Sequence, residues 1–463
     1  MERLLVYLEN CDRIDWLIGE DRHKFTQLAK SLYLELTQLL QQGTAPKILL
    51  VESDRIRFLA GFIAACAAGC PVFLGNPNWG KQEWQQVFEL VQPDLIFGYG
   101  NWGIREIILP TNTIYRVSTG SLIMIPTGGS TGKIKFAIHT WETLTASVQG
   151  FQQYFQLQHV NSFCVLPLYH VSGLMQFMRS FTTQGKLLNF NYKTLEAGEI
   201  PDIDPAEFFL SLVPTQLQRL LQNPVLADWL AQFKTVLLGG APAWLELLEQ
   251  ARNCKIRLAP TYGMTETASQ IATLKPEAFL QGYNNCGQVL PHAQVKIVNS
   301  EHQQLDINQI GSVTIQAKSL ALGYYPELFK NQDDFQLDDL GFVDEQGYLN
   351  IVGRSSNKII TGGENVYPNE VEVTIRETQL VDDICVIGIS DRTWGEVVTA
   401  VYVPKLHSVS PEQIQNAIAD KLSKFKQPKY WIPLESLPRN LQGKINYNKL
   451  IHIAQESLQN SHT

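Results

Sequence analysis

The feature that most constrains the fold is an alternation of helical patterns with short apolar runs. A helical pattern over residues 24–40 is followed by the apolar run 47–51, and a similar run lies at 235–238. Such alternation favours stacked α/β layers, because a strand that is buried on both faces needs helices to cover it. We therefore expect an α/β fold.

Length and the character of the C-terminal part predict two domains of unequal size. The 463 residues exceed what one hydrophobic core usually supports, so we expect a large domain of two stacked lobes and a smaller one. Toward the C-terminus, β-rich runs at 384–389 and 397–403 surround one helix, whose start has the pattern of a capping box. We place the boundary in the polar stretch 353–357, which gives domains 1–353 and 354–463.

Charge and composition narrow the range of functions. The formal net charge of −8 and the absence of a basic run argue against nucleic-acid binding. The cysteines are odd in number and lack zinc-site spacing, so we interpret them as reduced thiols of a cytoplasmic protein. The start of the chain has no apolar core of a signal peptide. The apolar stretch 58–74 contains two glycines and a proline, and we predict a buried helix followed by a strand there rather than a membrane span.

A glycine-rich segment after the apolar run 122–125 could hold a phosphate group. Three glycines leave backbone N–H groups open to an anion, while hydroxyls and two lysines add donors and positive charge. The segment does not fit the P-loop pattern, so it would bind a triphosphate in another architecture; a plain turn between strands is the alternative. The candidate residues are Thr127, Gly128, Gly129, Ser130, Thr131, Gly132, Lys133 and Lys135.

A second glycine pattern, Gly98 to Gly103, formally fits the dinucleotide-binding sequence GxGxxG. The segment after it ends at Pro110, which is too short for the helix that such a site requires. We therefore do not expect a nucleotide to bind there.

Further motifs point to a family. The run Tyr262-Gly263-Met264-Thr265-Glu266 resembles the signature of the ANL adenylating superfamily, which groups acyl-CoA synthetases, peptide-synthetase adenylation domains and luciferases. Other matches lie in the superfamily's order: Gly239-Gly240-Ala241-Pro242, Asp339-Leu340-Gly341, Gly353-Arg354, Gly362-Gly363-Glu364-Asn365 and Pro438 to Lys444. The resemblance covers roughly residues 120–450. It implies an enzyme that uses ATP and Mg²⁺ to form an acyl-adenylate and then transfers the acyl group to coenzyme A.

The resemblance also implies roles for residues of the large domain. Glu266 would bind Mg²⁺, which accepts one or two carboxylates together with phosphate oxygens, and Thr265 would bind the α-phosphate. The run from Gly239 to Pro242 with Tyr262 and Gly263 would form the adenine slot, and Asp339 with Arg354 would bind the ribose. Taken singly, each residue has a plainer interpretation as a turn residue or a surface charge.

The C-terminal domain is expected to move between the two half-reactions. Lys444 would stabilise negative charge during adenylation, and a rotation about Ser356 would then bring Gly362 and Gly363 to the thiol channel. Three positions depart from the usual pattern: Ser356, where many relatives have Asp or Lys, Ile134, where they have Pro, and Gly128, where they often have Ser. The last change removes one hydroxyl donor from the phosphate loop.

The segment 166–179 bears on the acid substrate. Within the superfamily it most resembles the o-succinylbenzoate-CoA ligases of menaquinone and phylloquinone biosynthesis, in which the residue matching His170 closes over the acyl pocket. Arg179 follows an otherwise apolar helical run, where an unpaired guanidinium would be costly, so it needs an anion. The second carboxylate of 2-succinylbenzoate could supply it; a salt bridge to a protein acid is the alternative.

Other functions stay open from the sequence. One is a CoA ligase for another aromatic or medium-chain acid. A carrier-loading adenylation module is disfavoured, because no carrier domain follows Lys444 and no amino-acid-binding Asp is evident. A non-enzymatic binding protein is disfavoured by the presence of Glu266, Asp339 and Lys444. The expected partners are small molecules: an aromatic dicarboxylic acid, ATP and coenzyme A.

Overall fold

The chain forms two compact units in the computed structural model. Unit 1 comprises Met1–Pro242, Leu247–Gln294 and Ile315–Phe335, and unit 2 comprises Ala243–Glu246, Val295–Thr314 and Gln336–Thr463. The structure describes residues 15–41, 45–98, 121–128, 133–330, 334–361, 364–391, 394–406, 408–439 and 445–460. A boundary at residues 353 and 354 stays a prediction, because compactness alone does not locate a point of rotation.

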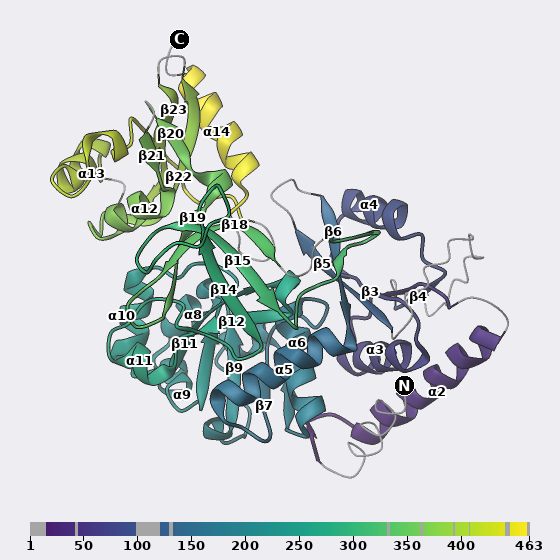
Figure 1. The fold of residues 1–463 in the computed structure, drawn as a ribbon. Helices are drawn as coiled ribbons and strands as arrows, with labels where there is room; N and C mark the ends of the chain where they lie inside the picture. Colours follow the sequence, from purple (N-terminus) through teal and green to yellow (C-terminus); the bar gives the residue numbers. More distant parts are fainter. Residues whose placement is uncertain are drawn as a thin grey trace. The chain divides into compact units, whose positions relative to one another are not determined.

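Unit 1 is built on two large sheets (Figure 1). The first has eight strands in the order β1 (Leu17–Ile18), β8 (Leu187–Asn189), β7 (Asn161–Cys164), β9 (Phe208–Leu212), β10 (Thr235–Leu238), β11 (Leu258–Met264), β12 (Ser269–Thr273) and β13 (Gln288–Val289). Its strands are parallel from β1 to β11 and antiparallel from there on. The carboxyl ends of β9, β10 and β11 therefore lie at one edge of the sheet.

The second sheet of unit 1 has seven strands. Their order is β17 (Glu327–Leu328), β16 (Gly323–Tyr324), β6 (Ile134–Thr140), β5 (Leu122–Gly128), β3 (Val72–Leu74), β2 (Ile48–Leu50) and β4 (Leu95–Phe97). Ile48 and Leu50 pack in the same core cluster as helix α3 (Arg55–Ala68), while Leu49 and Val51 pack in the cluster of α4 (Lys81–Val91). The run 48–51 is uniformly apolar because helices cover both faces of the sheet.

Helices fill the space between and around the two sheets. The largest core joins α2 (Arg22–Gln41), α3, α6 (Val171–Thr183) and strands of both sheets, with Phe62 of α3 packed edge to face against Phe177 of α6. The other described helices of this unit are α5 (Trp141–Phe155), α7 (Tyr192–Glu196), α8 (Pro214–Leu221), α9 (Pro224–Leu230) and α11 (Pro276–Leu280). The later residues of α10 (Leu245–Asn253) also belong to unit 1. This is the predicted stacking of α/β layers.

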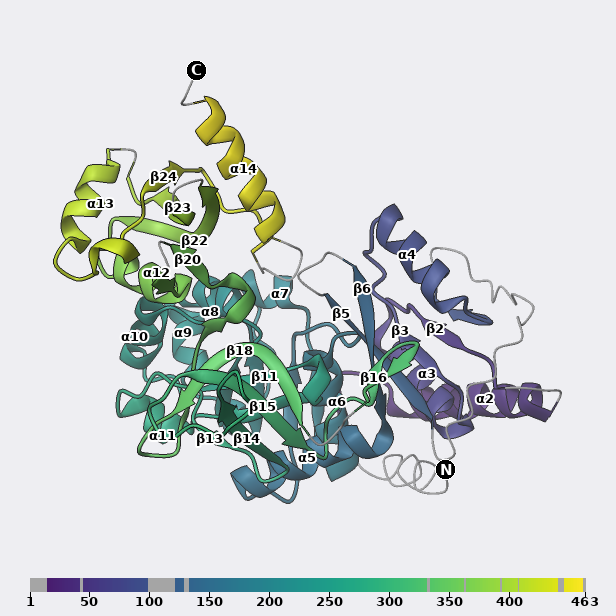
Figure 2. The ribbon, with the colours of Figure 1, turned by 45° about the horizontal axis from the view of Figure 1, so that its top comes forward.

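Unit 2 contains a β-sheet that is packed against helices (Figure 2). Five strands are joined, β21 (Glu364–Val366), β20 (Ile359–Thr361), β23 (Gly395–Pro404) and β22 (Val381–Asp391), with β24 (Tyr430–Pro433) on β23. Helices α12 (Pro368–Arg376) and α13 (Pro411–Ile418) pack with one face of this sheet, and α14 (Tyr447–Asn460) packs with the other. A four-stranded sheet of β14 (Ala293–Val298), β15 (Gly311–Ala317), β18 (Phe335–Val343) and β19 (Leu349–Arg354) belongs mostly to the same unit.

The structure confirms the local elements expected from the sequence. The stretch 58–74 contains most of α3 and all of strand β3. The helix predicted by the capping box is α13, where Ser410 N–H donates to Gln413 Oε1 at 2.9 Å. The polar stretch 353–357 comprises the last two residues of β19 and the short 3-10 turn Ser355–Asn357 that precedes β20. Strand β4 precedes the second glycine pattern, most of which lies outside the described residues. Across the described helices, none is long and apolar enough to cross a membrane.

Candidate active site

Two predicted nucleotide motifs lie side by side at the carboxyl ends of neighbouring strands. β10 and β11 are parallel, with Leu238 opposite Pro260, so the run Gly239–Pro242 lies beside Tyr262. A Cβ at position 239 would lie 2.5 Å from Thr261 Oγ1, and Gly240 has φ +83°. Glycine is therefore required where these two segments approach each other. The carboxyl edge of a parallel sheet is also where ligands bind in open α/β folds.

The turn that carries Glu266 connects β11 to β12. It is a short 3-10 turn, Thr265–Thr267, in which Met264 N–H donates to Thr267 Oγ1 at 3.0 Å. Glycine is again required before it, since a Cβ on Gly263 would lie 2.1 Å from Ser269 O. Glu266 is only 8% exposed, and its Oε1 accepts a hydrogen bond from the Tyr324 hydroxyl at 2.6 Å. The carboxylate is thus buried and oriented by a neutral donor.

His139 fixes the backbone of the same turn, and the sequence did not reveal it. The ring lies on β6 and is fully buried, with Nε2 2.8 Å from Thr265 O and Nδ1 3.0 Å from Thr143 Oγ1. Burial lowers the pKa of His139 to about 4, so the ring is neutral at physiological pH. A neutral ring donates through one nitrogen and accepts through the other, which suits a carbonyl on one side and a hydroxyl on the other.

The phosphate-loop candidate joins two antiparallel strands. Thr127 on β5 is opposite Lys135 on β6, and Gly128 is opposite Ile134. Lys135 Nζ lies 5.0 Å from the ring centroid of Tyr324, the residue that also bonds Glu266. Among the predicted loop residues, Gly129, Ser130, Thr131 and Gly132 lie outside the described part of the chain. Farther along β6, Ala137 and Ile138 pair with β16, which carries Tyr324.

The two acid-pocket candidates lie at opposite ends of helix α6. His170 is its N-cap residue, with its ring centroid 4.5 Å from that of Tyr169. Arg179 is near the other end, 3% exposed, and its Nη2 donates to Gln270 Oε1 at 2.7 Å and to Ser269 Oγ at 3.0 Å. Ser269 and Gln270 begin β12, directly after the Glu266 turn. The helix and the strand thus connect Arg179 with both His170 and Glu266.

No carboxylate contacts Arg179 within the described residues. Its guanidinium carbon lies 4.3 Å from the ring centroid of Phe151, and its Nε has no hydrogen-bond partner there. Burial lowers the pKa of Arg179 to about 9, which leaves it charged at neutral pH. The predicted alternative, a salt bridge to a protein acid, is not what this part of the structure contains.

Neutral groups with unused hydrogen-bonding capacity accompany Arg179. Buried atoms without a partner in the described structure include Gln270 Nε2, Gln176 Oε1 and both ring nitrogens of His292. Burial, and secondarily the charge of Arg179, lowers the pKa of His292 to about 4. The His292 ring lies against Gly150 of α5, where a Cβ would be 1.8 Å from Nδ1. Sequence reasoning missed Gln270 and His292, because β12 and the turn before β14 approach Arg179 only in the folded chain.

In unit 2 the structure describes some of the predicted residues. Asp339 on β18 is opposite Arg354 on β19, and Arg354 Nε lies 3.3 Å from Asp339 Oδ1. Ser356, the predicted hinge, donates its backbone N–H to Asp338 Oδ1 at 3.0 Å, and its hydroxyl bonds the other oxygen of that carboxylate. Gly362, Gly363 and Lys444 lie outside the described residues.

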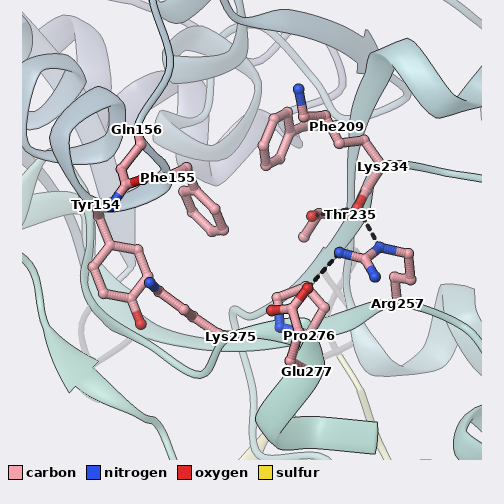
Figure 3. A pocket seen from close by; sticks show the side chains of 10 residues that line it. All are labelled: Tyr154, Phe155, Gln156, Phe209, Lys234, Thr235, Arg257, Lys275, Pro276 and Glu277. Carbon is pink, nitrogen blue, oxygen red and sulfur yellow. Dashed lines mark hydrogen bonds and ion pairs between the residues drawn. The ribbon is translucent and has the colours of Figure 1, made fainter.

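A separate pocket of about 220 Å³ opens at the other edge of the eight-stranded sheet (Figure 3). Thr235 begins β10 and Arg257 precedes β11, so the pocket lies at the amino ends of these strands. Arg257 is paired with Glu277 at 2.6 Å (Figure 3). None of the predicted site residues lines it. Its position opposite the carboxyl edge makes it a poor candidate for the active site.

Comparison with known proteins agrees with this arrangement. Residues 116–325 match the AMP-binding enzyme family, and residues 370–444 match the AMP-binding enzyme C-terminal domain. A 2-succinylbenzoate–CoA ligase of Enterococcus faecalis is 34% identical over 69% of this chain and 67% of its own length. Another, of Bacillus cereus, is 30% identical over 96% of each chain.

Solved structures show the same fold. The o-succinylbenzoate CoA synthetase of Bacillus subtilis, in complex with its acyl-adenylate intermediate, superposes with a TM-score of 0.81 at 24% identity, over 96% of this chain and 97% of that one. ATP-bound MatB of Rhodopseudomonas palustris gives 0.80 at 22% identity, over 97% and 98%. The chain therefore belongs to the AMP-binding (ANL) enzyme family, in which it is an AMP-forming acid-CoA ligase.

Proposed function

We propose that this enzyme activates 2-succinylbenzoate with ATP and transfers the acyl group to coenzyme A. The products are 2-succinylbenzoyl-CoA, AMP and pyrophosphate, which would place the reaction in menaquinone or phylloquinone biosynthesis. The observation that carries the proposal is the environment of Arg179: a guanidinium that is 3% exposed and bonded to neutral oxygens of Ser269 and Gln270. The 2-succinylbenzoate–CoA ligases among its relatives support the same substrate.

Among the described residues, Arg179 is bonded only to neutral side-chain oxygens, so its positive charge is not balanced there. Moving a charged group out of water costs several kcal/mol, and hydrogen bonds to neutral oxygens offset only part of that cost. A substrate carboxylate would offset more, because a charge-assisted bond contributes about 1.5 to 3 kcal/mol. A dicarboxylic acid can supply this charge and still present its other carboxylate for activation. A fatty acid has no such second group.

Gln270 and His292 would complete the binding of the second carboxylate. Gln270 Nε2 is a buried donor without a partner in the described residues, and a neutral His292 can donate through either ring nitrogen. Together with Arg179 Nε, these atoms offer three donors to a planar group with two oxygens. This set fits a carboxylate better than it fits an apolar acyl chain.

The adenylation step needs negative charge to be stabilised at the α-phosphate. The succinyl carboxylate oxygen would attack the α-phosphorus of ATP, and the bond to the leaving pyrophosphate would break. Thr265 and Lys444 would donate to the α-phosphate, and Lys444 would also contact the attacking carboxylate. The loop from Thr127 to Gly132, with Lys135, would hold the outer phosphates, while His170 would close over the acyl group.

The residues present fit a magnesium ion bound together with ATP. Mg²⁺ usually takes one or two carboxylates and completes its shell with water and phosphate oxygens. Glu266 supplies one buried carboxylate oxygen beyond the one that Tyr324 occupies. Such an ion would neutralise charge on the phosphates.

The second half-reaction transfers the acyl group. The thiol sulfur of coenzyme A would attack the acyl carbon and lose its proton to solvent, and the bond to AMP would break, with AMP leaving as the anion. The adenine would stay between Gly239–Pro242 and Tyr262–Gly263, with the ribose at Asp339 and Arg354. Rotation of the C-terminal domain about Ser356 would remove Lys444 from the site and bring Gly362 and Gly363 to it. The backbone N–H and the hydroxyl of Ser356 both bond the Asp338 carboxylate, so the rotation would strain or break these two hydrogen bonds.

The proposal is tested with a matched pair of acids. 2-Succinylbenzoate and 4-oxo-4-phenylbutanoate differ only in the ring carboxylate. The ratio of their kcat/KM values for CoA-ester formation therefore measures the effect of that one negative charge. We expect at least about tenfold preference for the dicarboxylate. Medium-chain fatty acids and short aliphatic dicarboxylates complete the panel. A higher kcat/KM for any of these acids than for 2-succinylbenzoate would replace the proposed substrate but not the ligase activity.

A further inference from the structure

The residue Tyr324 connects two motifs that are far apart in the sequence. Its hydroxyl donates to Glu266 Oε1 at 2.6 Å, and its ring centroid lies 5.0 Å from Lys135 Nζ. Glu266 is the candidate magnesium ligand, and Lys135 is a candidate phosphate-binding residue. One half-buried side chain thus contacts the two opposite charges that would face a metal–triphosphate complex.

The backbone around Tyr324 holds this contact in place. β16 pairs with β6, with Tyr324 opposite Ala137, and residues 135 and 137 of β6 point to the same face of the sheet. Ala321 N–H donates to Glu266 O at 2.8 Å. The segment before Tyr324 therefore bonds the backbone of Glu266, while Tyr324 itself bonds the Glu266 side chain. A Cβ on Gly323 would lie 2.2 Å from Glu327 O, which makes glycine necessary just before the tyrosine.

We propose that Tyr324 is a positioning residue for the metal–nucleotide site. Its hydroxyl fixes the rotamer of Glu266 and occupies one carboxylate oxygen, which directs the other toward the metal. Its ring supports Lys135 through a cation–π contact, which places that charge near the phosphates. A hydrogen-bond partner of this kind commonly changes metal affinity when it is removed. The inference rests on the proposed function, in which Glu266 binds magnesium.

The test separates metal binding from nucleotide binding. Binding of ATP to the full chain is measured by isothermal titration calorimetry with excess Mg²⁺ and, separately, with EDTA. Tyr324→Phe removes the hydroxyl and keeps the ring, so we expect ATP affinity in Mg²⁺ to fall by about tenfold, while affinity in EDTA stays unchanged. Tyr324→Leu removes both contacts, so affinity in EDTA should fall as well, by roughly threefold.

Two further variants make the result specific. Tyr154→Phe is the matched control, since the Tyr154 hydroxyl donates to Thr273 O at the same 2.6 Å but lies outside the candidate motifs. It should bind ATP like the wild type under both conditions. Glu266→Gln tests the assignment on which the inference rests, and it should abolish the gain in affinity that Mg²⁺ provides.

The outcomes distinguish the two claims. If Glu266→Gln loses the magnesium-dependent gain but Tyr324→Phe retains it in full, Tyr324 has no positioning role. If Glu266→Gln retains the gain, the metal assignment of Glu266 is wrong and the proposed function must be revised first. Equal losses for Tyr324→Phe in Mg²⁺ and in EDTA would indicate general damage, and so would a matching loss in Tyr154→Phe; either result overturns the inference.

Discussion

Two sets of charged side chains, one in each unit, are neutralised differently. In unit 1, Glu266 and Arg179 are 8% and 3% exposed, and their described hydrogen-bond partners are a tyrosine hydroxyl and neutral Ser and Gln oxygens. In unit 2, Asp383 accepts from Arg376 at 3.1 Å and from Arg439 at 2.6 Å, so opposite charges pair within the protein. A charge that the protein pairs contributes to the fold, whereas a buried charge with only neutral partners is suited to a charged ligand.

The largest effect is expected at Lys444, a charge of the C-terminal region that we assign to the substrate. Lys444→Ala should slow acyl-adenylate formation by roughly 100- to 1,000-fold, the usual consequence of losing one preorganised partner of a developing negative charge. ATP–pyrophosphate exchange measures this step. Thioester formation from supplied acyl-adenylate should be affected much less. Equal losses in both half-reactions would remove Lys444 from its proposed place in the first one.

A second prediction concerns Ser356 and the carboxylate that holds it. Ser356→Pro fixes the backbone torsion at the proposed hinge, so acyl-adenylate should form while CoA-ester formation falls by on the order of 100-fold. Proline also removes the N–H that donates to Asp338, and Asp338→Ala removes the same bond without fixing the torsion. Rapid-quench measurement of both steps should show near-normal transfer in Asp338→Ala. Normal transfer in Ser356→Pro would move the hinge elsewhere.

Variants of Arg179 test whether a buried charge with only neutral protein partners binds a charged ligand. Arg179→Ala should reduce the preference for 2-succinylbenzoate over 4-oxo-4-phenylbutanoate by roughly tenfold or more, or about 1.5 to 3 kcal/mol, in a double difference of kcat/KM values. Arg179→Met fills more of the space and removes a buried charge, so it should lose the same preference without lowering the free energy of unfolding. An unchanged preference in both variants would make Arg179 a structural residue.

The sequence pointed to those parts of the candidate site that lie in short local motifs. Gly239, Gly263 and Glu266 were expected from the resemblance of their motifs to those of the adenylating superfamily, and the close backbone approaches at Gly239 and Gly263 agree with glycine at these two positions. Tyr324 and His139 could not be expected in this way, since their partners are set by the pairing of β6 with β16 and by the fold of the Thr265 turn. The partners of Arg179 also come from sheet topology, which brings β12 to helix α6. Local motifs are therefore readable from sequence, whereas the neighbours that orient them depend on tertiary structure.

The smallest effect is expected from the paired charges of unit 2. Asp383→Ala leaves Arg376 and Arg439 without their shared carboxylate, but the three side chains are 16% to 31% exposed, so water offsets part of the loss. We expect the free energy of unfolding to fall by about 1 to 2 kcal/mol. Asp382→Ala is the matched control, because Asp382 is the exposed neighbouring carboxylate on the same strand.

Hydrogen–deuterium exchange of β22 and α12 measures this stability locally. Arg439 forms an isolated bridge with Ile445, and these two residues flank residues 440–444 in the sequence. Faster exchange in Asp383→Ala than in Asp382→Ala, with unchanged preference between the two test acids, would confirm that these charges serve the fold. If Asp383→Ala instead altered acid preference, or if both variants exchanged alike, pairing within the protein would not separate structural charges from ligand-binding ones.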